Sequence, residues 1–166
     1  MEIRKTRYDH PDAVLLTEQV QREYVERYGG PDETVMDADH FDGPQGEFMV
    51  GYFDGVPVAT GGWRGQDASP EGFEDGDAEL KRMYVVPQAR GRGFARRMLA
   101  ALEAGAAAAG RTRMVLETGQ KQPEAIALYA SCGYAPVGKF GYYRDSPTSV
   151  CLGKALPAPA TEAVSA

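Results

Sequence analysis

The 166-residue chain has few of the residues that build metal sites and disulfide frameworks, with only two cysteines and two histidines. Cys132 and Cys151 lie far apart in the sequence, and neither they nor His10 and His40 have partners at ligand spacing. This scarcity argues against a zinc site and against a disulfide-stapled fold. We therefore expect no metal, and we expect a reduced, cytoplasmic protein.

Long apolar runs and a basic charge balance are also missing. No segment reaches the ~20 apolar residues that a membrane span needs, and the first ten residues contain no apolar signal core. Acidic residues outnumber basic ones by 24 to 18, which gives a net charge of −6. Such a chain is poorly suited to a standing nucleic-acid partner. Its length and 43% hydrophobic content fit one globular domain without nucleic-acid or membrane partners.

Basic charge is instead concentrated in one segment, LKRMYVVPQARGRGFARRML, at residues 80–99. An apolar strand ends at Pro87, and a glycine-rich turn then runs into an amphipathic helix. Glycines at a helix start leave backbone N–H groups open, and the helix dipole adds partial positive charge there. Full charges come from Arg90, Arg92, Arg96 and Arg97. The segment predicts a binding site for a diphosphate.

The spacing of the turn narrows the choice of diphosphate. Gln88, Gly91 and Gly93 read Q-x-x-G-x-G. A dinucleotide fingerprint needs Gly or Ala where Arg96 stands, and a nucleotide P-loop needs four residues between its glycines and then Lys and Ser/Thr. Both patterns are absent, which argues against a nicotinamide dehydrogenase.

A second motif, KQPEAIALYASCGY, occupies residues 121–134. Pro123 and Glu124 suit the first turn of a helix, and Gly133 is a natural stop. Tyr129 falls inside this expected helix. Taken alone, it could equally be a tyrosine packed in the core.

Together the two motifs resemble the acetyl-CoA-binding segments of the GNAT superfamily of N-acyltransferases, R/Q-x-x-G-x-G/A and N-x-x-A-x-x-L-Y-x-x-x-G-F. The resemblance implies that the Tyr129 hydroxyl reprotonates the leaving CoA thiolate as a general acid. It also places Gln122 where the family has an Asn that contacts the pantetheine arm, so this chain departs from the family there. The implied cofactor-binding residues are Met83, Tyr84, Val85, Gln88, Arg90, Gly91, Arg92, Gly93, Phe94, Ala95, Arg96 and Gln122.

Periodicity and turn signals predict an alternating order of elements. We expect strands at 2–8, 47–53, 56–64, 78–86, 113–118, 134–140 and 149–155, and helices at 11–28, near 33–39, at 93–109 and around Tyr129. This order matches the GNAT fold, an α/β (α+β mixed) architecture. The resemblance implies a central, mostly antiparallel sheet flanked by helices and splayed at the acetyl-CoA site. Residues 1–156 are expected to form one domain, and the Pro- and Ala-rich residues 157–166 a disordered tail.

A general base is the next requirement of the implied chemistry, because the attacking amine must lose a proton. The resemblance points to Glu79, at the cleft end of the strand before the turn. Alternation places Glu79, Lys81, Met83 and Val85 on one face, although a bulge would break that count. The alternative is that Glu79 pairs with a neighbouring Lys or Arg. A backbone N–H near Val85 is implied as the oxyanion donor.

The sequence defines the amine acceptor less well than the cofactor. The acidic stretches 31–42 and 67–77 could attract a cationic amine or simply face solvent. Conversely, a substrate carboxylate could be held by Arg64, Lys81, Arg82 or Arg144. Tyr142 and Tyr143 could line an amine pocket or pack against the last strands. Both a small metabolite and an exposed protein amine remain open.

The expected function is therefore acetyl-CoA-dependent N-acetyl transfer to a primary amine, by direct attack in a ternary complex. The expected partners are acetyl-CoA and the amine, with a homodimer left open. The rival hypothesis keeps the fold without the catalysis, as an acetyl-CoA-binding sensor or partner-binding domain. A tyrosine beside the CoA sulfur favours the enzyme, because binding alone needs no acid there.

Overall fold

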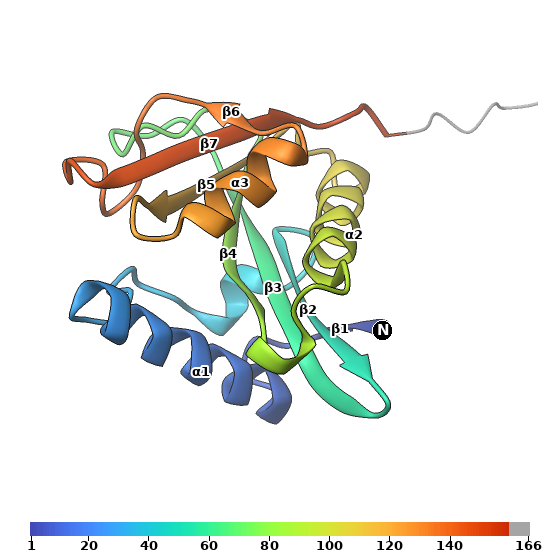
Figure 1. Cartoon of the computed structure of the whole chain (residues 1–166). Coiled ribbons are helices and arrows are strands. Elements are labelled where there is room, and N and C mark those ends of the chain that lie inside the picture. The colour runs from blue at the N-terminus through green and yellow to red at the C-terminus, as the bar shows by residue number, and fades with distance from the viewer. Residues whose placement is uncertain (160–166) are drawn as a thin grey trace, which may run out of the picture.

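The computed structural model describes residues 1–159, which form a seven-stranded sheet with helices packed around it (Figure 1). The expected tail begins at 157, so most of it lies outside the described residues. The strands are β1 (Glu2–Thr6), β2 (Gly46–Phe53), β3 (Val56–Gln66), β4 (Asp77–Val85), β5 (Arg113–Gly119), β6 (Ala135–Pro136) and β7 (Ser149–Ala155). The helices are α1 (Pro11–Tyr28), α2 (Phe94–Ala108), α3 (Pro123–Ser131) and the short 3-10 helices η1 (Ala38–Phe41) and η2 (Pro87–Ala89).

The sheet has the order β1-β2-β3-β4-β5-β7-β6, and only β4 and β5 pair in parallel. That parallel pairing is short, because Asp77–Glu79 alone match Arg113–Val115. Beyond it the two strands diverge, as Figure 1 shows. The expected splayed, mostly antiparallel sheet is confirmed, and a wedge opens between β4 and β5.

The hairpin of β2 and β3 follows from its turn residues. Asp54 and Gly55 have φ values of 51° and 75°. This left-handed pair is the conformation that a two-residue hairpin turn requires, and Asp-Gly adopts it readily. Local chemistry therefore sets this part of the sheet, as predicted.

Helices cover both faces of the strands before the wedge. A Cβ at Gly61 would meet Leu102 of α2 at 2.8 Å, whereas one at Gly62 would meet Phe41 of η1 at 2.9 Å. Since neighbouring residues of a strand point to opposite faces, α2 and η1 lie on opposite sides of β3. In the described part of the chain, no helix is both long and apolar enough to cross a membrane.

A bulge distorts β4 just after the parallel pairing ends. Thr60 pairs with Tyr84 and Gly62 with Lys81, so one residue of β3 faces Arg82 and Met83 together. Arg82 has a φ of 56°, in the left-handed region that non-glycine residues seldom adopt. Such strained residues gather at functional sites. The strict alternation expected along this strand is therefore broken at Arg82.

Two expected elements differ from the structure. The predicted strand 134–140 is reduced to Ala135–Pro136, because Pro136 has no N–H to continue a ladder and Phe140 instead packs on Phe73, with ring centroids 4.9 Å apart. The short helix predicted near 33–39 is displaced to η1, which begins after Asp37 because that side chain accepts a hydrogen bond from the Asp39 N–H.

Candidate active site

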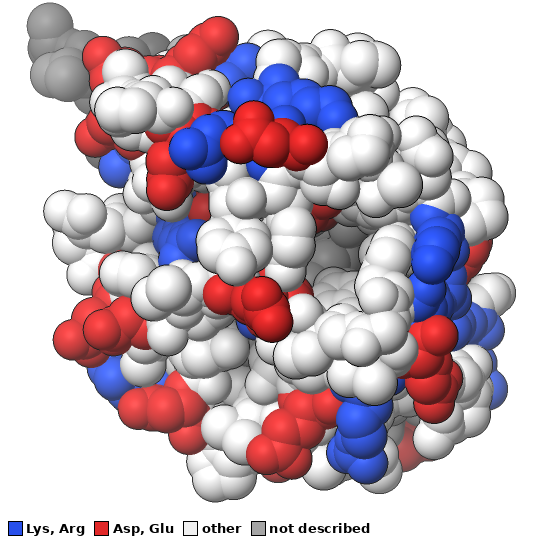
Figure 2. Space-filling view, turned by 90° about the vertical axis from the view of Figure 1, so that its left-hand side faces the viewer, with Lys and Arg blue, Asp and Glu red and all other residues white. Residues whose placement is uncertain are grey.

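A cavity of about 490 Å³ occupies the wedge between β4 and β5. Figure 2 shows the face that carries its opening, a deep hollow surrounded mostly by uncharged atoms. The end of α1 and the following loop form one wall, and β5, the start of α3 and the loop before β7 form the other. The lining residues that carry the argument are Tyr24, Tyr28, Asp32, Glu33, Lys81, Arg82, Met83, Glu117, Gln122, Tyr129, Tyr143 and Ser149.

The glycine turn follows the carboxyl end of β4, the end at which β4 and β5 diverge, and lies directly before α2. Gly91 and Gly93 have φ values of 78° and 77°, and nothing lies within 4 Å of where a Cβ would stand on either. Gly93 is the N-cap of α2 and gives the helix no side-chain hydrogen bond. The first-turn N–H groups, including those of Phe94, Ala95 and Arg96, therefore keep the anion-binding capacity of an uncapped helix start.

The arginines of the turn connect it to both walls of the cleft. Arg90 donates from Nε to the Val85 carbonyl (2.9 Å) and pairs with Glu23 of α1 (2.6 Å). Arg96 donates to Ser131 (2.6 Å) at the end of α3 and to the Cys132 sulfur. Arg90 therefore links the turn to α1, and Arg96 links the start of α2 to the end of α3.

The remaining residues of the predicted cofactor set separate into two groups. Met83 and Gln122 line the cavity, and Gln122 donates from Nε2 to the Tyr28 hydroxyl at 3.1 Å. Gln88 and Arg92 are exposed at the turn, whereas Tyr84 is buried under the Arg90 guanidinium. The predicted cofactor set is thus divided between the lining of the cavity and the turn before α2.

Tyr129 lies on α3 and lines the cavity. Its ring packs edge-on against Tyr134, with centroids 5.7 Å apart. Its hydroxyl has no hydrogen-bond partner among the described residues, and burial raises its pKa, so it keeps its proton at neutral pH. The cavity lining therefore includes a protonated tyrosine on α3.

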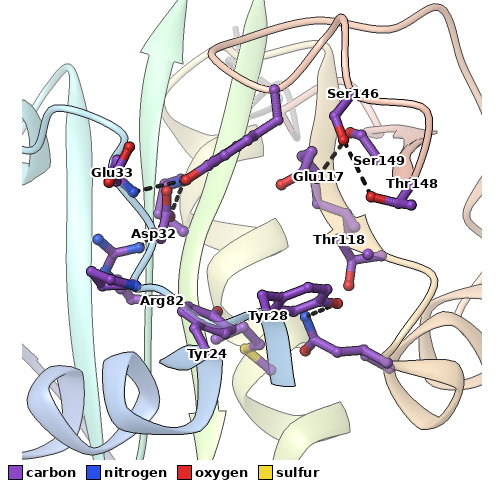
Figure 3. Close-up of a pocket in the computed structure, with 18 of the residues that line it drawn as sticks. Tyr24, Tyr28, Asp32, Glu33, Arg82, Glu117, Thr118, Ser146, Thr148 and Ser149 are labelled. Atoms are coloured by element: carbon purple, nitrogen blue, oxygen red, sulfur yellow. Dashed lines mark hydrogen bonds and ion pairs between the residues drawn. The ribbon is translucent and has the colours of Figure 1, made fainter. Parts of the chain in front are cut away.

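Tyr24 on α1 is a second tyrosine in this lining, and it is half-buried. Burial raises the pKa of its hydroxyl as well. Sequence reasoning did not identify Tyr24, because helical periodicity cannot distinguish a core position from a cavity wall. Figure 3 shows Tyr24 beside Tyr28 on the α1 side of the cavity.

Glu79 does not line the cavity. Its carboxylate accepts from Arg64 Nε at 2.7 Å and from Gln66 Nε2 at 3.1 Å, and both charged side chains are almost fully shielded from solvent. Glu79 and Arg64 are direct cross-strand neighbours in the β3–β4 register, which explains the pair. The geometry favours the structural alternative weighed for Glu79.

Glu117 on β5 is an acidic side chain that does line the cavity. It accepts a hydrogen bond from the Ser149 hydroxyl at 2.9 Å, and burial raises the pKa of its carboxyl to about 7. A carboxyl with that pKa exchanges a proton readily at neutral pH. The sequence analysis missed it, since a lone Glu in an apolar strand carries no motif.

Asp32, Lys81 and Arg82 form an ion cluster on the opposite wall (Figure 3 labels Asp32 and Arg82). Asp32 Oδ2 accepts from Lys81 Nζ at 2.9 Å and from Arg82 Nη1 at 2.5 Å, and Oδ1 accepts from Thr34. Burial alone would raise the pKa of Asp32, but the two cations hold it well below its usual range. The carboxylate is therefore ionised and neutralised within the wall.

Two other cations considered for a substrate carboxylate lie elsewhere. Arg64 is engaged by Glu79, and Arg144 bonds the Gly141 carbonyl at 2.8 Å. Tyr143 lines the cavity and accepts from the Glu33 N–H, whereas Tyr142 is exposed.

Among residues 1–159, no group of three or more His, Cys, Asp and Glu side chains could hold a metal ion.

Comparisons with known proteins agree with this geometry. A family model described as the acetyltransferase (GNAT) family matches residues 17–134. An IAA acetyltransferase from Azospirillum brasilense is 36% identical over 146 residues, covering 87% of this chain and 92% of the relative. A Klebsiella pneumoniae structure, provisionally named an acyl-CoA N-acyltransferase, has a TM-score of 0.73 at 28% identity, covering 93% of this chain and 97% of that one.

A further solved structure shares the fold. An aminoglycoside 6'-N-acetyltransferase complexed with coenzyme A has a TM-score of 0.65 at 16% identity. The alignment covers 96% of this chain and all of the other. At that identity the likeness shows the shared fold alone.

Proposed function

The chain belongs to the GNAT family of acetyltransferases, and on that basis we propose that it transfers the acetyl group of acetyl-CoA to a primary amine by direct attack in a ternary complex. The observation that carries the proposal is the cavity in the β4–β5 wedge, where Glu117 and Tyr129 both line the space. The 36%-identical relative, which is named for acetyl transfer, supports acetyl as the group transferred.

The glycine turn suits the diphosphate of acetyl-CoA. The space around Gly91 and Gly93 is open, and a side chain at either position would occupy it. We propose that the N–H groups of this turn hold the diphosphate, and that Met83, Val85 and Gln122 contact the pantetheine arm. When bound, acetyl-CoA supplies the reactive thioester.

Glu117 is the proposed base. An alkylamine has a pKa of about 10.4, so a neutral amine at pH 7 costs about 4–5 kcal/mol in equilibrium terms. Glu117, with a pKa of about 7, can take that proton as the amine nitrogen bonds to the acyl carbon. Ser149 orients the carboxylate through its hydrogen bond.

Tyr129 is the proposed acid. As the carbon–sulfur bond breaks, the leaving thiolate needs a proton, and the protonated Tyr129 hydroxyl, on the cavity lining, is the proposed donor. The phenolate is then reprotonated from solvent. Glu79 is assigned to the scaffold, since its carboxylate is held by Arg64.

Steady-state kinetics with acetyl-CoA and an amine panel test the proposal. We expect free thiol to form together with acetylated amine detected by mass spectrometry. Initial-rate lines for the two substrates should intersect, because both must be bound before transfer. Parallel lines would indicate an acetylated enzyme instead. Binding of acetyl-CoA without transfer to any amine would favour the sensor alternative.

A further inference from the structure

We propose that the amine acceptor also carries a carboxylate, and that Lys81 and Arg82 hold this carboxylate while the amine faces Glu117. The acceptor class is then the amino acids. This inference rests on the proposed function, because it specifies the substrate of the same cavity.

The first argument is the net charge of the ion cluster that Asp32, Lys81 and Arg82 form on one wall of the cavity. Two cations, Lys81 and Arg82, share the single carboxylate of Asp32, so this shielded cluster keeps one positive charge. The Glu33 carboxylate next to Asp32 also lines the cavity, but its side chain is exposed. The side chains of Lys81, Arg82 and Asp32 are 10%, 3% and 12% exposed, so bulk water screens this charge poorly. A second anion in the cavity would neutralise it.

Unused hydrogen-bond donors are the second argument. A lysine ammonium has three donors and an arginine guanidinium five. Within the described residues, Lys81 and Arg82 each make one side-chain hydrogen bond, and both go to the same oxygen of Asp32. The buried Arg82 Nε has no partner among these residues, so the guanidinium is incompletely satisfied by the protein. Carboxylates are the preferred partners of such donors.

The shape of β4 is the third argument. In a regular strand, Lys81 and Arg82 would point to opposite faces. The bulge opposite Gly61 and the left-handed φ of Arg82 let both residues line the cavity. The backbone strain at Arg82 is therefore accompanied by two adjacent cations on one wall.

Apart from Asp32, the acidic loops bring only one carboxylate of the described residues to the cavity, that of Glu33, which is exposed and accepts from the Tyr142 hydroxyl. Asp39 and Asp42 pair with Arg7, and Asp67 pairs with Arg111. Asp32 is already neutralised. The amine is assigned to Glu117, which is more shielded than Glu33 and lies on the wall across from Asp32 and Arg82 in Figure 3. A zwitterion bound in this way places each of its charges beside an opposite one.

A substrate comparison with the unmodified protein tests the inference. We would measure kcat/KM for the common L-amino acids and for their C-terminal amides, which keep the size and remove the carboxylate charge. The preferred amino acid should exceed its amide by about 10-fold or more, as expected for a lost charge-assisted contact. Equal or better use of the amides would overturn the inference while leaving acetyl transfer intact. Transfer to no amine at all would instead defeat the proposed function.

Substitution of Lys81 tests whether this residue binds the substrate carboxylate. Lys81→Met keeps the chain length and leaves Asp32 paired with Arg82, so the fold should persist, as a thermal melt would check. It should raise KM for the amino acid about 10-fold and leave the amide unaffected, and Lys81→Arg should restore much of the loss. Lys5→Met is the matched control, because Lys5 pairs with Glu47 outside the cavity. Equal losses for acid and amide would overturn the assignment of Lys81.

Discussion

At the turn before α2 the protein presents backbone, whereas in the wedge between β4 and β5 it presents charged side chains. The turn is open, with free space where a Cβ of Gly91 or Gly93 would lie. The wedge is lined by shielded groups such as Asp32, Arg82 and Glu117, each paired or with a shifted pKa. The first site suits an anion recognised by helix N–H groups, and the second suits a substrate recognised by its own charges.

This difference predicts which substitutions the glycine turn and the wedge each tolerate. A backbone site depends on the conformation and emptiness of two positions, so a single Cβ can destroy it. A side-chain site depends on pairs, so removing one partner leaves another charge buried and uncompensated. Substitutions at the turn should therefore affect cofactor binding, and substitutions in the wedge should affect acceptor use, pH dependence or stability.

Gly93→Val should have the largest effect, because the new side chain stands where the diphosphate is proposed to bind. Acetyl-CoA at ~100 times its dissociation constant should stabilise the wild type by ~2.7 kcal/mol. We expect this stabilisation and the turnover to be lost in the variant. Thermal melts of the wild type and of Gly93→Val, each with and without acetyl-CoA, measure this stabilisation.

Gly110→Val is the matched control for that variant. Gly110 follows α2, has a φ of +86° and also has free space at its Cβ position. Both variants should carry a strain cost of about 1–3 kcal/mol, but Gly110→Val should keep the acetyl-CoA shift. Loss of the shift in both, or in neither, would contradict a backbone site at the turn.

Tyr129→Phe should come next. The substitution keeps the ring packing on Tyr134 and removes only the hydroxyl, so acetyl-CoA affinity should change little. We expect kcat to fall by about 10²-fold if the hydroxyl is the general acid. Tyr24→Phe, which removes another cavity-lining hydroxyl, should lower kcat far less. A larger fall in kcat in Tyr24→Phe than in Tyr129→Phe would instead assign the role of general acid to Tyr24 on α1.

Glu79→Gln should change stability rather than catalysis. It leaves the shielded Arg64 charge without its carboxylate, which should lower the free energy of unfolding by up to about 3–5 kcal/mol. Below the melting transition, kcat should stay near that of the wild type. Chemical denaturation and initial rates on the same sample check both statements. A large kcat loss without destabilisation would return Glu79 to the role of base.

Glu117→Gln should change stability in a pH-dependent way. Burial raises the pKa of Glu117 from its ordinary value of 4.5 to about 7. Between these values the unfolded chain ionises first, so the favourable effect of the protonated carboxyl is lost as pH rises through about 7. The variant should be more stable than the wild type at pH 8, by on the order of 1–3 kcal/mol, and similar at pH 4. A pH-independent difference would contradict the raised pKa.

Sequence reasoning succeeded where a structure is encoded locally. The hairpin depends on Asp54-Gly55, and the turn depends on the spacing of Gly91 and Gly93, so both were predictable from neighbouring residues. The splay of β4 and β5 was also predicted, through the resemblance to the family.

The wedge between β4 and β5 was harder to predict from the sequence, because its contacts join segments that are distant along the chain. The pairing of Glu79 with Arg64 depends on the β3–β4 register, which composition does not reveal. The bulge at Arg82 likewise arises from pairing between strands. Glu117 has no neighbouring motif, and only the fold brings it into the cavity with Ser149. Side-chain sites assembled from several elements need the fold before they can be identified.

The pH dependence of kcat/KM for the acceptor, in wild type and Glu117→Gln, tests the central claim most directly. The wild-type profile should rise through an inflection near pH 7, where Glu117 ionises and can accept the proton of the bound ammonium. Glu117→Gln should lose this inflection and be slowest relative to wild type near neutral pH. It should recover as pH approaches the pKa of the amine, about 10 for a lysine-like group. An inflection near pH 7 that persists in Glu117→Gln would contradict the account.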